Sequence, residues 1–300
     1  MSANSVLLIP KDKELYFFSS IASFDVISGK ELLNESFFKE HPSLDHYELI
    51  IFLDYGFDTE MAARIRPHVS GKIILFFWNH FKKEHFQLLE KAQNEPAIDE
   101  IYHFDALEAN ALKLKHNSSF YSSEMKIPHN IPEYDLFFGA TNHGRKEKAE
   151  ALKKEFDALG LRTDYFILPL KGNEQAGYLP YPEYLERTSH SAGILELLRE
   201  GQHGVTLRTF ESVYFQKKLL TANKVISHYH FYDPENFFLL NERPLAELPD
   251  FLHRPYRPVE EKYLEFFDAQ NWAKRFADYD PNIFKEYEYK EELLNETIEF

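Results

Sequence analysis

The feature that most constrains this fold is a series of continuous apolar runs, each followed by a stretch of helical composition. The clearest runs in the first half of the chain cover residues 48–53 and 72–78, and residues 59–69 between them have helical composition. A strand that is apolar on both faces needs cover on both faces, which is typical of parallel sheets flanked by helices. The alternation therefore predicts an α/β fold.

The second half of the chain repeats this pattern after a break. Residues 118–132 are polar and have no clear period. Residues 134–139 and 163–168 then read as strands, and residues 145–159 between them form an amphipathic helical pattern. The break is the expected domain boundary.

The length and composition of the chain agree with two domains. Its 300 residues, 44% of them hydrophobic and 16% aromatic, suffice for two cores. We predict two Rossmann-like, doubly wound domains that face each other across a cleft, over residues 1–127 and 128–280. The second domain includes a closing helix over residues 259–277, and residues 281–300 form a charged tail.

The composition also excludes several classes of protein. The chain has no cysteine, which rules out disulfides and thiolate metal sites. Its formal net charge of −15 disfavours nucleic-acid binding, which relies on a basic surface. No apolar run approaches the roughly 20 residues that span a bilayer. The N-terminus lacks the features of a signal peptide, so we expect a cytoplasmic protein.

A glycine-containing loop that leads into a helix is the strongest functional signal. Within residues 201–211, a helix that begins near Thr206 would direct the free N–H groups of Thr206 and Leu207 at an anion. Arg208 adds a guanidinium, and Glu211, one turn on, could accept hydrogen bonds from sugar hydroxyls. These groups suit a sugar nucleotide. The alternative is a turn in which Arg208 and Glu211 only pair with each other.

Further candidates lie at other strand ends of the second domain. Ligands of doubly wound sheets bind beyond the carboxyl ends of the strands, and the segments after residues 139, 168 and 200 all lie at such ends. We therefore expect them to converge. The candidate ligand-binding residues are Gly139, Asn142, Arg145, Lys171 and Glu196, of which Glu196 either faces the ligand or pairs with a neighbouring arginine.

At these residues the chain resembles bacterial glycosyltransferases of the two-domain GT-B architecture that build lipopolysaccharide, capsule or exopolysaccharide. The resemblance spans about residues 70–275 and is most specific over residues 201–223. Its other parts include residues 134–139 with Arg145, residues 194–196, and residues 229–236.

The resemblance implies transfer of a sugar from a nucleotide donor, a UDP-sugar as the first expectation, to a glycan hydroxyl without metal or another cofactor. It implies that the second domain holds the donor and that the final helix crosses back to brace the first domain. Thr206, Leu207 and Arg208 would hold the diphosphate, and Glu211 the ribose or donor-sugar hydroxyls. A lipid-linked acceptor would bring the protein to the inner face of the plasma membrane as a peripheral protein.

An inverting transfer needs a general base beside the acceptor hydroxyl. The strand ends of the first domain offer Asp54, the pair Asn79 and His80, and Asp105. Asp54 is our candidate, because it follows the strand at residues 48–53 and a carboxylate at that end points into the predicted cleft. Helix capping or turn formation is the alternative role for this residue. The acidic pair Asp278 and Asp280 follows a helix rather than a sheet strand, so we do not take it as a metal site.

Other functions are compatible with the same pattern. A nucleotide-sugar epimerase or hydrolase would use a similar donor site and turn over without an acceptor. A scaffold derived from a transferase would bind nucleotide weakly or not at all. A periplasmic-type binding protein shares the two-domain plan, but the expected lack of a signal peptide argues against it.

Overall fold

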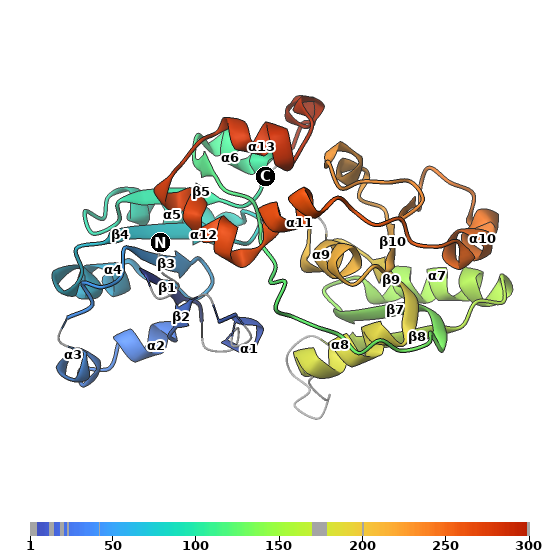
Figure 1. Cartoon of the computed structure of the whole chain (residues 1–300), viewed down its shortest axis with the longest axis horizontal. Helices are drawn as coiled ribbons and strands as arrows, with labels where there is room; N and C mark the ends of the chain where they lie inside the picture. The colour runs from blue at the N-terminus through green and yellow to red at the C-terminus, as the bar shows by residue number, and fades with distance from the viewer. Residues whose placement is uncertain are drawn as a thin grey trace. The chain divides into compact units, whose positions relative to one another are not determined.

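The computed structural model describes residues 5–11, 15–18, 21–22, 24–41, 43–169, 179–199 and 201–298. The chain divides into two compact units, each built on its own parallel sheet (Figure 1). The first unit combines Met1–Met125 with Glu265–Phe300, and the second unit is Lys126–Leu264. Residues 265–280, predicted to close the second domain, thus belong to the first unit.

The first unit contains a sheet of six parallel strands in the order β2-β1-β3-β4-β5-β6. The strands are β1 (Val6–Ile9), β2 (Asp25–Val26), β3 (Leu49–Leu53), β4 (Lys72–Phe77), β5 (Glu100–His103) and β6 (Lys115–His116). The N-terminal part of this unit also contains the helices α1 (Leu15–Phe18), α2 (Gly29–Leu32), α3 (Phe37–Glu40), α4 (Thr59–Ile65), α5 (Lys83–Gln93) and α6 (Ala106–Leu112), with a 3-10 helix, η3 (Arg66–His68).

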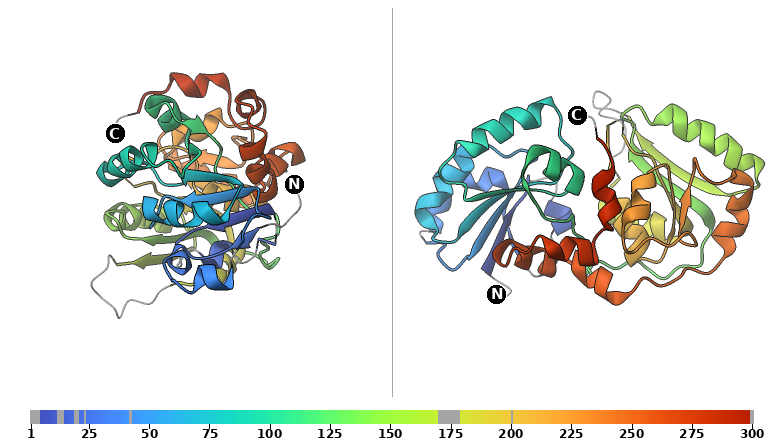
Figure 2. Two further views of the ribbon diagram at one scale, coloured as in Figure 1. Left: turned by 90° about the vertical axis from the view of Figure 1, so that its left-hand side faces the viewer. Right: turned by 90° about the horizontal axis from the view of Figure 1, so that it is seen from above.

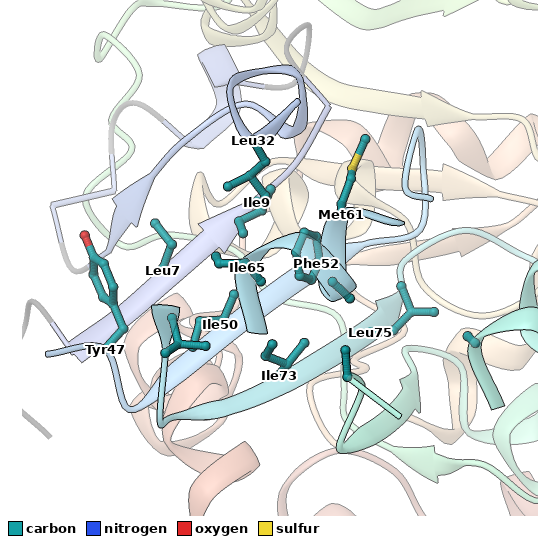
Figure 3. Packing of buried hydrophobic residues seen from close by; sticks show 14 of the residues in the cluster. Leu7, Ile9, Leu32, Tyr47, Ile50, Phe52, Met61, Ile65, Ile73 and Leu75 are labelled. Atoms are coloured by element: carbon teal, nitrogen blue, oxygen red, sulfur yellow. The ribbon is translucent and has the colours of Figure 1, made fainter. Parts of the chain in front are cut away.

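Helices cover both faces of this sheet (Figure 2). On one face Ile50, Ile73 and Leu75 pack against Ile65 of α4, in a core that is buried throughout (Figure 3). On the other face the ring of Phe76 lies 5.1 Å from that of Trp272. Burial on both faces explains why the strands read as continuous apolar runs, and it confirms the predicted α/β class for this unit.

The C-terminal segment is an integral part of the first unit. The segment begins within α11 (Glu261–Phe267), of which residues 261–264 belong to the second unit. It continues with α12 (Ala269–Ala277), α13 (Asn282–Tyr287) and the 3-10 helix η6 (Glu291–Asn295). The guanidinium of Arg275 donates hydrogen bonds to Asn117 and Ser118, and the buried carboxylate of Glu288 lies 2.8 Å from Nε2 of His116. The charged tail expected over residues 281–300 is anchored to this unit within residues 281–298, because Phe284 and Leu293 are each only 1% exposed.

The second unit contains five parallel strands in the order β11-β10-β9-β7-β8. The strands are β7 (Tyr134–Thr141), β8 (Thr163–Leu168), β9 (Ser191–Glu196), β10 (Lys218–Thr221) and β11 (Phe237–Leu239). The helices are α7 (Lys146–Ala158), α8 (Tyr181–Ser189), α9 (Leu207–Tyr214) and α10 (Leu248–His253), with the 3-10 helices η4 (Lys224–His228) and η5 (Leu245–Glu247).

Alternate side chains of β7 enter different cores. Phe138 packs with Phe156 of α7 and Phe251 of α10, whereas Phe137 packs with Tyr184 of α8. In both sheets the first strand of the unit lies between the second and the third, which is the doubly wound order. Both units are therefore Rossmann-like, as predicted. The switch point, where the strand order reverses, lies between β1 and β3 in one sheet and between β7 and β9 in the other.

Within the described residues, no helix combines the length and the hydropathy that a membrane-spanning helix requires.

Candidate functional site

The candidate site of the second unit lies at the carboxyl ends of β7 and β9, which flank the switch point of its sheet. Ligands of doubly wound folds bind at this place because the connections leave these two strands toward opposite faces. Three arginines gather there: Arg145 at the start of α7, Arg199 after β9, and Arg208 in the first turn of α9. Arg199 was missed from the sequence, although its position just after a strand end was a usable signal.

Arg145 ties the two central strands together. One guanidinium nitrogen donates to the backbone oxygen of Leu197 at 3.0 Å, and the other donates to that of Thr141 at 2.6 Å. The residue is 8% exposed, and its Nε has no hydrogen-bond partner among the described residues. The side chain thus holds a positive charge in place at the edge of the sheet.

Arg208 reaches back from α9 to β7. Its Nη2 donates to the backbone oxygen of Gly139 at 2.5 Å, and its guanidinium lies 5.9 Å from the ring centroid of Tyr184. A Cβ on residue 139 would stand 2.7 Å from the Tyr184 ring, so this strand position requires glycine. The predicted candidates Gly139, Arg145 and Arg208 are therefore brought together.

The three arginines repel one another. Burial first, and then the charges of Arg208 and Arg199, lower the pKa of Arg145 to about 10. Burial and the charge of Arg208 likewise lower the pKa of Arg199. Burial would lower the pKa of Arg208 as well, but the charges of Tyr184, Glu211 and Glu196 raise it. A bound anion would relieve the repulsion that remains on Arg145 and Arg199. This potential is local, since the chain as a whole carries a formal charge of −15.

Glu196 ends β9 and anchors three neighbouring segments. Its Oε1 accepts from the hydroxyls of Thr206 at 2.5 Å and Thr209 at 3.3 Å, and its Oε2 accepts from Thr221 at 2.6 Å. The residue is 1% exposed. We call these three hydroxyls, from Thr206, Thr209 and Thr221, the threonine cage of Glu196. The sequence predicted a ligand contact or an arginine partner for Glu196 and did not predict this cage. The ligand-binding role of Glu196 stays a prediction.

The helix start predicted near Thr206 is confirmed, since α9 begins at Leu207 with Thr206 as its N-cap. The Thr206 hydroxyl accepts from the backbone N–H of Arg208 at 3.1 Å, and the N–H of Thr206 donates to the hydroxyl of Thr209 at 3.4 Å. The N–H of Thr206 is thus engaged within the capping box, whereas Leu207 opens the first turn beside the arginines.

Glu211 is buried beneath two tyrosines of α8. Its Oε1 accepts from the hydroxyl of Tyr181 at 3.0 Å and its Oε2 from that of Tyr184 at 2.7 Å. Burial raises its pKa to about 7, although the charge of Arg208 and the two hydroxyls act in the opposite direction. Its hydrogen-bonding partners are therefore tyrosines, and a simple pair with Arg208 does not describe this residue. Both tyrosines were missed from the sequence.

Two other predicted residues have different outcomes. Asn142 lies just after β7, where its side chain accepts from the backbone N–H of Lys146 at 3.0 Å and so supports the start of α7. Lys171 falls outside the described residues.

In the first unit, Asp54 follows β3 as predicted, but its carboxylate is buried and hydrogen-bonded to other residues of the chain. Its Oδ1 accepts from the backbone N–H of Trp78 at 2.8 Å, and both oxygens accept from the side-chain amide of Asn79. The residue is 3% exposed, and burial raises its pKa. This geometry resembles the turn-forming alternative, and the base role of Asp54 stays a prediction.

No family model and no curated protein matches the chain. Among solved structures, the chain is similar to a mutant of TarM from S. aureus in complex with fondaparinux, α-GlcNAc-glycerol and UDP, at 11% sequence identity and a TM-score of 0.39. The match covers 82% of this chain and 54% of that one, so this chain spans about half of its length. A likeness at this level carries no argument about function, which has to rest on the residues of this chain.

Proposed function

We propose that the second unit binds a nucleotide-sugar and that the protein transfers the sugar to a hydroxyl of a glycan. The observation that carries this proposal is the gathering of Arg145, Arg199 and Arg208 at the switch point of the second sheet. Three clustered positive charges favour a multiply charged anion, and a diphosphate is such an anion. The same cations would stabilise the charge that develops on the departing nucleotide.

The residue roles follow from the position of each group. Arg199 is exposed and Arg208 lies in the first turn of α9, so both are proposed to contact the diphosphate, with the N–H of Leu207 beside them. Lys171 and Asn142 are proposed as further contacts. Glu211 would hold a donor hydroxyl by exchanging a tyrosine hydroxyl for that of the sugar or ribose.

The finer parts of the proposal come from the sequence resemblance. We propose a UDP-sugar donor, a metal-independent reaction in which the arginines neutralise the diphosphate, and a glycan acceptor of bacterial surface polysaccharide. The reaction would take place in the cytoplasm, at the inner face of the plasma membrane where the acceptor is lipid-linked.

Isothermal titration with UDP, GDP, CMP, dTDP and ADP, each with and without EDTA, tests this proposal. We expect one nucleotide to bind without metal, and Arg199→Gln to weaken it about 10-fold, which corresponds to the loss of about 1.4 kcal/mol from one charge-assisted contact. Arg199 suits this test because it is exposed, so its replacement spares the core.

Arg162→Gln is the matched control, because the Arg162 side chain is 67% exposed and the residue directly precedes β8, at the amino end of the strands and opposite the proposed site. It should bind nucleotide as the wild type does. Binding of no nucleotide, or equal losses in the two variants, would contradict the proposed donor site.

A further inference from the structure

A cavity of about 340 Å³ lies in the first unit, between the strands β1 and β2 and the helices α2 and α3. Its lining residues come from β1, from the segment that runs from the end of β2 to α3, and from the segment that leads into β3, and all of them belong to this unit. Small-molecule sites have volumes of about 300–1,000 Å³, so this cavity has room for a small ligand.

The inner wall of the cavity is apolar. Leu7 of β1 and Tyr47 lie in the buried core on this face of the sheet (Figure 3), and Leu44 belongs to the same core. The hydroxyl of Tyr47 donates to Asp25 at 2.9 Å, so the polar end of this side chain already has a partner. The half-buried ring of Phe37 adds further apolar surface. An apolar group placed against this wall would leave water, which favours binding.

The exposed part of the lining is acidic. Glu31 of α2 and Glu40 of α3 are both exposed, and within the part of the chain that the structure describes neither carboxylate forms a hydrogen bond or an ion pair. No lysine or arginine is among the lining residues that the structure describes. Among these residues His41 alone can become cationic, and its ring lies 4.7 Å from that of Phe37.

The two parts of the lining select a ligand by its charge. An ammonium group would donate charge-assisted hydrogen bonds to Glu31 and Glu40, for which no lysine or arginine of the described lining competes. The aromatic rings of Phe37 and Tyr47 favour the same charge, because the faces of such rings carry negative potential. An anion would be repelled by both carboxylates, and a metal ion would leave the apolar wall unused.

The cavity differs from the ligand site that the topology of this sheet offers. The switch point lies between β1 and β3, and ligands of doubly wound sheets bind there beyond the carboxyl ends of the strands. Leu44 and Tyr47 precede β3, so the cavity reaches toward the amino end of that strand instead. A ligand in the cavity would therefore not occupy the switch point.

We propose that the cavity binds a small organic cation, with its ammonium group paired to Glu31 and Glu40 and its apolar or aromatic group against Leu7 and Leu44. This site is independent of the proposed transferase activity, because the cavity and the three arginines lie in different units. Nucleotide titration and the experiments that follow therefore test two separate sites, and either can fail without the other.

The preference for a cation is measured by calorimetric titration of the full chain at pH 8 with 2-phenylethylamine, 2-phenylethanol and 3-phenylpropionate. These probes share a phenyl group and differ in charge. We expect the amine to bind about 10-fold more tightly than the alcohol, as one charge-assisted contact would provide, and the acid to bind most weakly. Absence of amine binding, equal Kd values for the amine and the alcohol, or tighter binding of the acid would overturn the proposal.

The role of the two carboxylates is tested by Glu31→Gln and Glu40→Gln, each of which removes one charge and keeps the shape of the side chain. Each should weaken binding of the amine about 5-fold, as expected for the loss of one partly exposed ion pair, and leave binding of the alcohol unchanged. Glu35→Gln is the matched control, because Glu35 is exposed in the same segment but does not line the cavity. Equal losses in all three variants would indicate general attraction to the acidic surface and would overturn the site.

The position of the ligand is tested by filling the cavity. Ser36 lines it, and its side chain makes no capping hydrogen bond at the start of α3, so Ser36→Phe adds volume without removing such a bond. This variant should bind neither the amine nor the alcohol, while its circular dichroism spectrum matches that of the wild type. Unchanged amine binding by folded Ser36→Phe would place the ligand elsewhere and contradict the proposal.

Discussion

At the scale of the residue, Glu211 sets how the second unit responds to pH. Burial raises its pKa from 4.5 to about 7, so the folded state holds the proton more tightly than the unfolded chain does. The resulting stabilisation is complete below the unfolded pKa and is lost as the pH rises through 7. Urea unfolding from pH 4.5 to 7.5 should show a loss on the order of 3 kcal/mol that Glu211→Gln abolishes. Glu155→Gln, exposed on α7, should retain the loss, and a Glu211→Gln profile that matches the wild type would contradict the assignment.

At the scale of the element, Glu196 joins β9, α9 and β10 through three threonine hydroxyls. Glu196→Ala strands these hydroxyls in the core, and we expect it to lower the free energy of unfolding by about 3 kcal/mol. Thr221→Val removes one of the hydroxyls that Glu196→Ala leaves without a partner. The double variant should therefore lose less free energy of unfolding than the sum of the losses in Glu196→Ala and Thr221→Val. Circular dichroism during urea unfolding measures both effects. Strictly additive losses of free energy would contradict an energetic coupling between Glu196 and Thr221.

At the scale of the whole molecule, the C-terminal segment completes the first unit. Trp272 is fully buried against Phe76 and Phe120, so Trp272→Ala should lower the stability of this unit by about 3–5 kcal/mol. The chain has two tryptophans, so Trp78 remains as the fluorescence reporter of the first unit. In Trp272→Ala, the midpoint of the unfolding transition that Trp78 fluorescence reports should fall. Gln270→Ala, a change at an exposed position of the same helix, should leave that midpoint unchanged. An unshifted Trp78 transition would mean that α12 contributes little to this unit.

Local elements were predictable because their signals lie in neighbouring residues. The apolar run at 72–78 corresponds to β4 (Lys72–Phe77), the run at 163–168 to β8 (Thr163–Leu168), and the helical pattern at 145–159 to α7 (Lys146–Ala158). The closing helix expected over residues 259–277 is two helices in the structure. The helix is interrupted at Asp268, which caps α12 and forms a parallel backbone β-bridge with Tyr121. That interruption depends on a residue far away in sequence, which no local pattern reports.

The candidate site divides in the same way. Sequence placed Gly139, Arg145, Glu196 and Arg208 at strand and helix ends, and the doubly wound order brings these ends to one edge. Sequence could not show that Glu196 is caged by threonines or that Glu211 lies under Tyr181 and Tyr184, because those partners are 10 to 30 residues away.

By itself, the sequence determined the α/β class, the two βα arrays and the start of α9, because apolar periodicity and capping act within a few residues. Only the tertiary structure decided that residues 265–298 complete the first unit and that Glu108, rather than solvent, faces Nδ1 of His80. Burial and the pairing of buried polar groups are long-range properties, since each partner is chosen by the packing of segments that are distant along the chain.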